Sequence, residues 1–351
     1  MILVKQTNLG DYNIDNLRDS TKQALGFDEN ADYNEWKKKV GDKFIELCRF
    51  SEFEANSCPL NFKIVEKLDK DGYTEYKFTI DTEKGVTIPC YILIPTTGKE
   101  KYPVAITMQG HADGCHLSVG RFNNEKDEEY VKTRGDFAIQ AVKNGFIALA
   151  VEQRGMGETK PWGDGYRGGV GGLMCSYSAQ IMFMLGKTLI GARCWDVSKA
   201  IDALSNFKEC DLDKILITGN SGGGTTSYYA ACYDKRIKVS VPSCAVATYK
   251  HSILNQYHCT CNYIPFAYKY FEMADVSCML NGRDLIVVAG EIDNIFPIES
   301  VHDCYKVIEK IYQKENAQDK CSLVVTPQGH YWCKDIVWPA IMAKVNSLSW
   351  F

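Results

Sequence analysis

The sequence has no strong excess of charge of either sign and no long apolar run. Its 351 residues include 40 Lys and Arg against 44 Asp and Glu, which leaves a net charge of −4. A field this weak does not attract the phosphate backbone of a nucleic acid, so we expect no nucleic-acid partner. The longest apolar run, residues 145–151, is far shorter than the about 18 residues of a membrane span, and we expect no membrane association.

A secretion signal, a repeat and a low-complexity linker are also missing. The N-terminal segment MILVKQTNLGDYN has an apolar start but lacks the charged-then-apolar layout of a secretory signal. The 15 cysteines are odd in number and scattered along the chain, unlike a short disulfide framework. Together these features favour a cytoplasmic protein with reduced thiols.

No complete zinc-binding pattern is visible either. His258, Cys259 and Cys261 lie close together in the chain, but a zinc motif needs a second pair of Cys or His at a defined spacing. The neighbouring sequence does not supply that pair. We therefore expect no metal, and no pattern in the sequence indicates an organic cofactor.

What the sequence does contain suits a large α/β protein. At 45% hydrophobic residues it has ample material for a core, and its length corresponds to about two domains or one large domain with insertions. Residues 1–60 are predicted to form a helical extension and residues 61–351 the main domain. The helical prediction rests on residues 33–50, where four apolar residues occur at helical spacing: Trp36, Val40, Phe44 and Leu47.

The hydrophobic pattern of the main domain changes once along its length. Residues 73–80 and 86–94 have the alternation and the glycine turns of antiparallel strands. After them, short apolar strands alternate with helices, which is typical of a parallel sheet with helices on both faces. The later strands are predicted at 102–108, 146–151, 215–218, 239–242, 284–289 and 323–326, and the helices at 136–144, 194–207, 227–232 and 301–314. Two insertions, at about 160–191 and 247–275, are expected over the carboxyl edge of the sheet.

The most informative segment is a predicted strand that runs into Gly219-Asn-Ser221-Gly-Gly223 and then into a helix. In this context Gly-x-Ser-x-Gly is typical of a nucleophilic serine on a sharp strand-to-helix turn. The following helix directs its N-terminal N–H groups at the site, where an oxyanion would be stabilised. The alternative is a phosphate-binding loop, but the Gly-Lys-Ser/Thr ending of that loop is absent.

A nucleophilic serine needs a base and an orienting acid, which follow it in the chain in this architecture. His330 lies in a short loop after the last predicted strand and is the predicted base, whereas His302 lies within a predicted helix. Two carboxylates follow the strand at 284–289. We favour Asp293, which lies in the loop, over Glu291, which is nearer the strand.

The same mechanism needs two N–H donors for the oxyanion. One is predicted at Gly222, the residue after the nucleophile. The second is predicted in the loop Gln109-Gly110-His111, which follows the strand at 102–108, with the backbone N–H of His111 directed inward.

Five motifs occur in an order that resembles the α/β-hydrolases of the acetyl xylan esterase type, a group related to the cephalosporin C deacetylases and the dienelactone hydrolases. The motifs are Gln109–His111, Glu152–Gly157, Gly219–Gly223, Gly290–Pro297 and Gly329–His330. The resemblance runs from about residue 73 to the C-terminus. It implies an α/β-hydrolase fold with a mostly parallel central sheet, antiparallel N-terminal strands and helical cap insertions.

The resemblance also bears on individual residues. The turn at Arg154–Gly157 is similar to the Arg-Gly-Gln-Gly turn of the deacetylases, which implies a structural Arg154 that contacts a carboxylate beneath the site. Two positions depart from the family: Gln109-Gly110 stands where His-Gly is usual, and Gly222 stands where the deacetylases have Gln. Both departures concern the acyl and sugar preference rather than the triad.

These observations predict a serine esterase that removes acetyl groups from an acetylated sugar or oligosaccharide. Four aromatic residues of the insertions are candidates for sugar stacking, although such residues more often simply pack: Trp162, Tyr166, Tyr177 and Tyr263. Two alternatives stay open, a serine peptidase of the prolyl-oligopeptidase type and a non-catalytic binding protein with a hydrolase fold. A homo-oligomer is compatible with the sequence.

Overall fold

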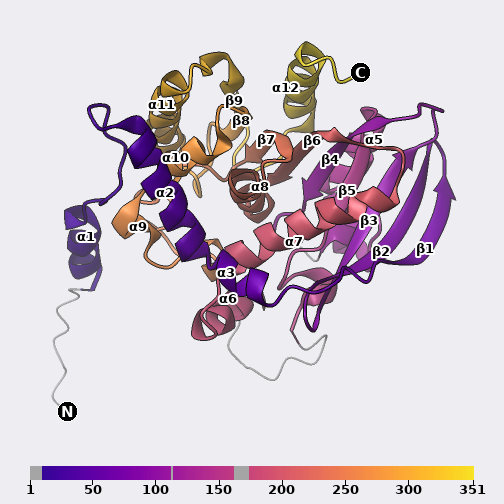
Figure 1. Ribbon diagram of the computed structural model, residues 1–351, viewed down its shortest axis with the longest axis horizontal. Coiled ribbons are helices and arrows are strands. Elements are labelled where there is room, and N and C mark those ends of the chain that lie inside the picture. Colours follow the sequence, from indigo (N-terminus) through magenta and orange to yellow (C-terminus); the bar gives the residue numbers. More distant parts are fainter. Residues whose placement is uncertain (1–9, 112–113, 162–173) are drawn as a thin grey trace.

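A nine-stranded sheet in the order β1-β2-β3-β5-β4-β6-β7-β8-β9 forms the centre of the computed structural model (Figure 1). The structure describes residues 10–111, 114–161 and 174–351. The strands are β1 (Lys63–Lys70), β2 (Tyr73–Glu83), β3 (Val86–Pro95), β4 (Tyr102–Met108), β5 (Ile147–Val151), β6 (Cys210–Asn220), β7 (Ile237–Ser243), β8 (Asp284–Gly290) and β9 (Cys321–Thr326).

The first three strands are antiparallel and the later ones are parallel, as the sequence predicts. β1, β2 and β3 pair in sequence, and β3 then joins β5 in an antiparallel pair. Gly72 and Gly85 make the two turns with φ angles of 82° and 79°, which glycine adopts without steric cost. From β5 to β9 every neighbouring pair is parallel. Their carboxyl ends therefore meet at one edge, where open α/β sheets bind ligands.

Helices cover both faces of this sheet. α5 (Phe137–Lys143) and α12 (Lys334–Ser347) pack on one face, and α7 (Leu189–Ala203), α8 (Gly222–Tyr233) and α11 (Ile298–Lys314) pack on the other. Successive strand residues serve opposite faces: Ile215 and Ile217 belong to one apolar cluster, and Leu216 belongs to the other. The predicted α/β architecture is thus confirmed.

The N-terminal region is helical, with α1 (Gly10–Ser20), α2 (Tyr33–Cys48) and α3 (Phe50–Ala55). The single helix predicted over 33–50 is interrupted at Arg49, whose φ of 64° is left-handed and ends α2. Phe44, Phe50 and Phe53 are fully buried in the same apolar cluster as α7 and α8. Because α2 and α3 share that core, the division into an extension and a catalytic domain near residue 60 stays a prediction.

Several boundaries differ from the prediction for local reasons. α7 begins at Leu189 rather than 194, because the Thr188 hydroxyl caps it by accepting the N–H of Gly191 at 3.0 Å. Pattern analysis predicts neither α12 nor α6 (Met174–Met184), which lies in the first insertion. The remaining α-helices of the described residues are short: α4 (Glu125–Tyr130), α9 (Ala267–Tyr270) and α10 (Met273–Val276).

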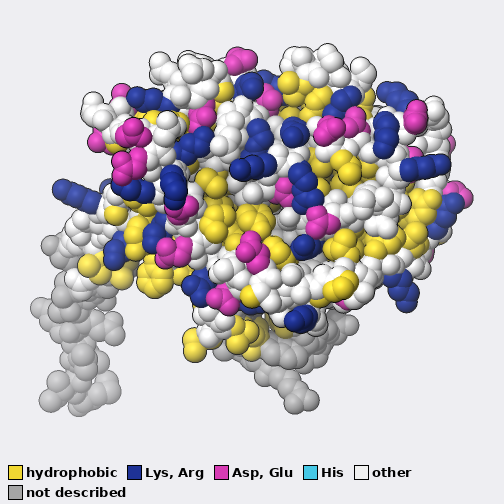
Figure 2. Space-filling model, viewed as in Figure 1, with side chains coloured by type: hydrophobic (Ala, Val, Ile, Leu, Met, Phe, Trp, Pro, Cys, Tyr) yellow, Lys and Arg dark blue, Asp and Glu magenta, His cyan; other side chains and the backbone are white. Residues whose placement is uncertain are grey.

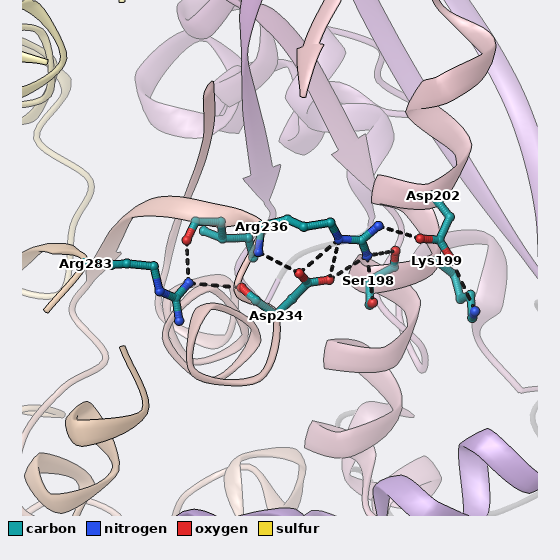
Figure 3. Close-up of polar contacts among 7 residues, drawn as sticks. Ser198, Lys199, Asp202, Asp234, Arg236 and Arg283 are labelled. Carbon is teal, nitrogen blue, oxygen red and sulfur yellow. Dashed lines mark hydrogen bonds and ion pairs between the residues drawn. The ribbon is translucent and has the colours of Figure 1, made fainter. Parts of the chain in front are cut away.

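An ion-pair network holds α7 to the turn that follows α8 (Figure 3). The Arg236 guanidinium contacts Asp234 at 2.6 Å and reaches Asp202 on α7 at 2.5 Å. Arg236 also donates to the backbone carbonyl of Ser198 at 2.9 Å, and Arg283 donates to that of Asp234 at 3.0 Å. These contacts fix the far end of α8, whose first turn carries the predicted nucleophile.

A second ion-pair network involves Arg154, which lies in the turn after β5. Its guanidinium donates twice to Asp196 at 2.7 Å and once to Glu83 at 2.5 Å. Both carboxylates are buried, with side chains 1% exposed. The resemblance implied one carboxylate partner for Arg154, and the structure supplies two.

The molecular surface carries charges of both signs. On the face shown in Figure 2, Lys and Arg side chains are interspersed with Asp and Glu, and apolar side chains lie between them. Within the described residues, no helix is long and apolar enough to cross a membrane.

Replacing Arg154 by methionine tests how much the buried network contributes to the free energy of unfolding. Arg154→Met leaves buried carboxylates without their main partner, which typically costs about 3–5 kcal/mol in the free energy of unfolding. Lys38→Met is the matched control, because Lys38 and Asp42 form an exposed pair that contributes at most about 1 kcal/mol. Urea unfolding measures both, and equal losses in the two variants would contradict this account.

Candidate active site

The predicted nucleophile lies where β6 passes directly into α8. Ser221 has φ 57° and ψ −124°, a strained conformation for a residue with a side chain. Its N–H donates to the carbonyl of Ser243 at 2.9 Å, and its own carbonyl accepts the N–H of Thr225 at 2.8 Å. This turn places the serine at the carboxyl edge of the sheet, as a nucleophile elbow requires.

Glycines around Ser221 allow a very close approach of backbone to backbone. A Cβ at Gly219 or Gly223 would overlap the carbonyl of Met108, the last residue of β4. Gly222 has a different neighbour, since a Cβ there would lie 2.8 Å from Cε1 of His111. The ring of His111 therefore packs directly on Gly222, which accounts for glycine at a position where the deacetylases have Gln.

Asp293 and His330 are brought together by the ends of two neighbouring strands, β8 and β9. His330 Nδ1 lies 2.9 Å from Asp293 Oδ2. The other oxygen, Oδ1, accepts the N–H groups of Ile295 and Phe296 at 2.8 and 3.1 Å. Phe296 also stacks on the His330 ring, with 5.9 Å between centroids. The imidazole is thus held from its edge and from one face.

The Asp293 carboxyl is kept ionised despite its burial. Burial alone would raise the pKa of this group, but the hydrogen bond and charge of His330 and the two backbone N–H groups outweigh that effect. The net result is a pKa below the usual range of an aspartate. A fixed negative charge therefore lies against the imidazole.

The two alternative residues lie elsewhere. Glu291 has an exposed side chain, and its backbone N–H donates to the carbonyl of Thr326. His302 is on the exposed side of α11 and lines a separate surface depression with Tyr305 and Leu323. The structure brings neither of them to His330.

A cavity of about 330 Å³ opens at this edge of the sheet. Ser221 and His330 both line it, together with Gly110 and His111 of the predicted oxyanion loop. Gly222 is the first residue of α8, so its N–H is among those at the positive end of the helix. Ser221, His330 and the loop of His111 therefore lie around one opening, with Asp293 behind His330 and Gly222 next to Ser221.

The predicted stacking aromatics have a different outcome. Trp162 and Tyr166 lie outside the described residues. Tyr263 packs against the core and donates its hydroxyl to the carbonyl of Ile253 at 2.9 Å. Neither Tyr263 nor Tyr177 is among the described residues that line the cavity. Its aromatic rings come instead from Tyr130 and Tyr257.

His258 is a cavity residue to which sequence reasoning assigned no such role. Its Nδ1 lies 3.1 Å from the side-chain nitrogen of Asn262, and its buried Nε2 has no hydrogen-bond partner among the described residues. Burial lowers the pKa of His258 to about 4, so the imidazole is neutral at pH 7. Its Nε2 is thus a buried polar atom beside the cavity.

Four metal-ligating side chains gather beside the cavity. His111 and Cys175 join the sequence pair Cys259 and Cys261, and their ligand atoms all lie within 4.8 Å of one another. The sequence supplies only the Cys-x-Cys pair as a signal, because Cys175 lies 84 residues before Cys259 and His111 is more distant still. A smaller group of possible ligands contains Cys244 with Asp293 and His330.

Comparison with known proteins places this chain in a family. The model of the Abhydrolase family matches residues 12–241. "Putative hydrolase YtaP" of Bacillus subtilis (strain 168) is 25% identical over 292 residues, which cover 82% of this chain and 87% of that protein.

Solved structures of esterases share the fold. A "putative acetyl xylan esterase" from Bacteroides fragilis NCTC 9343 superposes with a TM-score of 0.77 at 15% identity, covering 97% of this chain and 96% of the other. A glucuronoyl esterase from Solibacter usitatus superposes with a TM-score of 0.64 at 13% identity, covering 92% and 97%. The predicted α/β-hydrolase fold is confirmed. The chain belongs to the Abhydrolase family.

Proposed function

We propose that this chain hydrolyses carboxylic esters through Ser221, His330 and Asp293. The observation that carries the proposal is the 2.9 Å contact between Asp293 and His330 beside the cavity that Ser221 lines. A serine on a strained elbow, a histidine base and a buried acid in this chain order form the triad of the α/β-hydrolases.

The mechanism follows from these positions. Ser221 Oγ attacks the ester carbonyl carbon while Nε2 of His330 takes the hydroxyl proton. Asp293 holds the proton of His330 on Nδ1 and stabilises the imidazolium that forms, because its own charge is fixed by two backbone N–H groups. His330 then gives its proton to the leaving alcohol, and water hydrolyses the acyl-enzyme by the same steps.

Two backbone N–H groups are proposed to bind the tetrahedral oxyanion. Gly222 supplies one at the start of α8, and His111 supplies the other from the loop after β4. Removing one such donor typically costs about 3–4 kcal/mol of transition-state stabilisation. Packing of the His111 ring on Gly222 keeps the two donors beside each other.

The proposed substrate is an acetyl ester of a sugar or oligosaccharide. The acyl group would lie between the His111 loop and the segment from Tyr257 to Cys259, both of which line the cavity. Tyr257 is 87% exposed at the opening, and His258 lines the cavity. An exposed aromatic face and a neutral polar group suit a sugar ring, and the acetyl xylan esterase fold neighbour is compatible with this choice.

Removing the nucleophile or the base tests the catalytic proposal. Ser221→Ala and His330→Ala should each lower kcat for p-nitrophenyl acetate by at least about three orders of magnitude, because a triad acts as a unit. His302→Ala is the control on the same fold and should retain the wild-type rate. Retention of more than about a tenth of the activity in Ser221→Ala would contradict the nucleophile assignment.

The acid is tested by a second matched pair. Asp293→Asn preserves the shape but leaves His330 in the wrong tautomer, so kcat should fall about ten-thousandfold. Glu291→Gln should change kcat far less, since that side chain is exposed and it is Asp293 that contacts His330. Steady-state rates on the same ester decide, and the reverse ranking would make Glu291 the acid.

Acyl chain length tests the proposed acetyl preference. We expect kcat/KM to fall steeply from acetyl to butyryl to octanoyl p-nitrophenyl esters, because each clashing methylene costs about 1–3 kcal/mol. Acetylated xylo-oligosaccharides should release acetate, whereas proline-containing peptide amides should not react. A flat or rising profile would refute the acetyl preference and leave the serine hydrolase in place.

A further inference from the structure

Three separate segments meet at the cluster beside the cavity. His111 follows β4, Cys175 lies in the first turn of α6, and Cys259 and Cys261 lie at the 3-10 turn Thr260–Asn262. His111 Nε2 is 3.0 Å from Cys261 Sγ, and Cys175 Sγ is 3.1 Å from Cys259 Sγ. All three cysteines are buried.

The two short contacts of the cluster, at 3.0 and 3.1 Å, are slightly below the separations between the ligands of a tetrahedral zinc ion, so these atoms need to move apart by only roughly half an ångström to bind one. With Zn–S about 2.3 Å and Zn–N about 2.0–2.1 Å, neighbouring ligand atoms lie about 3.4–3.8 Å apart. The four ligand atoms all lie within 4.8 Å of one another. The 3.1 Å between the sulfurs of Cys175 and Cys259 is far longer than a disulfide bond of about 2.05 Å. Three Cys and one His are a common structural zinc set.

The charge of the surroundings points the same way. Arg193 of α7 is buried, and its guanidinium donates to the backbone carbonyl of Arg154 at 2.9 Å. Its electrostatic partners are the sulfurs of Cys261 and Cys175, and no carboxylate forms an ion pair with it in residues 10–111, 114–161 and 174–351. A buried cation needs a compensating negative charge, which neutral thiols do not provide.

We propose that His111, Cys175, Cys259 and Cys261 bind one Zn²⁺ ion. Each cysteine loses its proton to solvent and binds as a thiolate, and neutral His111 binds through Nε2. Two positive and three negative charges leave the complex at −1, which the guanidinium of Arg193 neutralises. All four positions are filled by the protein, so the ion holds structure rather than activating water.

The position of this ion gives it a specific structural task. It ties the first insertion, through Cys175, and the second insertion, through Cys259 and Cys261, to the loop that carries His111. Cε1 and Nδ1 of the same ring lie against Gly222. The ion therefore fixes the segment from which the second oxyanion donor is proposed to come. Zinc binding itself does not depend on the proposed hydrolysis. Only the role of the ion in positioning the oxyanion donor rests on the proposed function.

Metal analysis of the full chain tests the proposal directly. The chain purified under reducing conditions without chelators should contain about one Zn²⁺, measured by plasma mass spectrometry. After the zinc is exchanged for Co²⁺, the intact chain should show strong visible d–d bands and near-ultraviolet thiolate-to-cobalt charge transfer. These readouts require no catalytic activity and no substitution.

Cysteine variants locate the site. Cys175→Ser and Cys261→Ser should reduce bound zinc to about a tenth or less of the wild-type content. Cys58→Ser is the matched control, because Cys58 is half-buried and lies outside the cluster, and it should retain the metal. If a ligand variant does not fold, the cobalt spectrum of the unaltered chain still decides the question.

Two results would overturn the proposal. One is a reduced chain that neither contains zinc nor binds Zn²⁺ or Co²⁺ on titration. The other is a disulfide among Cys175, Cys259 and Cys261 in the purified chain, found by peptide mass spectrometry. Failure of the zinc proposal is distinguishable from failure of the proposed function: a zinc-free chain whose hydrolysis depends on Ser221 refutes the ion alone, and a zinc-loaded chain whose hydrolysis survives Ser221→Ala refutes the esterase triad alone.

Discussion

The backbone of β6 and the first turn of α8 press directly on the last residue of β4. Gly219 and Gly223 permit that contact because any Cβ there would overlap the Met108 carbonyl. The parallel register pairs Met108 with Gly219, so β4 and β6 end side by side and the segments that follow them begin at the same edge of the sheet. Ser221 emerges at the same edge as the loop of Gly110 and His111, and the cavity forms between them. The proposed nucleophile and the proposed oxyanion loop are therefore positioned by one steric constraint.

The buried charged side chains around this contact have different kinds of partner. Arg154 lies between two carboxylates beneath the site, and Asp293 accepts three hydrogen bonds. Arg193 has no carboxylate partner among the described residues and lies against cysteine sulfurs instead. A zinc–thiolate complex would complete this pattern by giving that guanidinium a negative neighbour. The same ion would connect both insertions to the oxyanion loop, so that the walls of the cavity and the catalytic turn form one unit.

Short-range signals in the sequence predict much of this arrangement. The strand that runs into Gly-x-Ser-x-Gly is readable because the elbow is made by consecutive residues, and the hairpins at Gly72 and Gly85 are readable for the same reason. The sequence alone separates Asp293 from Glu291 less clearly, because both carboxylates follow β8. The fold separates them by presenting the N–H groups of Ile295 and Phe296 to only one carboxylate.

Long-range features were beyond the sequence. Cys175 and His111 reach Cys259 and Cys261 only after the sheet and both insertions have folded, so spacing along the chain gives no sign of a four-ligand cluster. Tyr263 is an aromatic residue in an insertion, which is why the sequence suggests it for sugar binding. In the structure its ring packs against the core, and the exposed Tyr257 lies at the opening of the cavity instead. α12 was also missed, and it carries Pro339 in its interior, which ordinarily signals a helix break.

Trapping the covalent intermediate tests the central claim most directly. The chain mixed with p-nitrophenyl acetate, quenched in acid within one turnover and digested, is measured by peptide mass spectrometry. The account predicts an acetyl group on the peptide that contains Ser221, at a residue fragmentation assigns to Ser221, together with a matching burst of p-nitrophenol. An acetyl group on another residue, or steady turnover without any adduct, would contradict it.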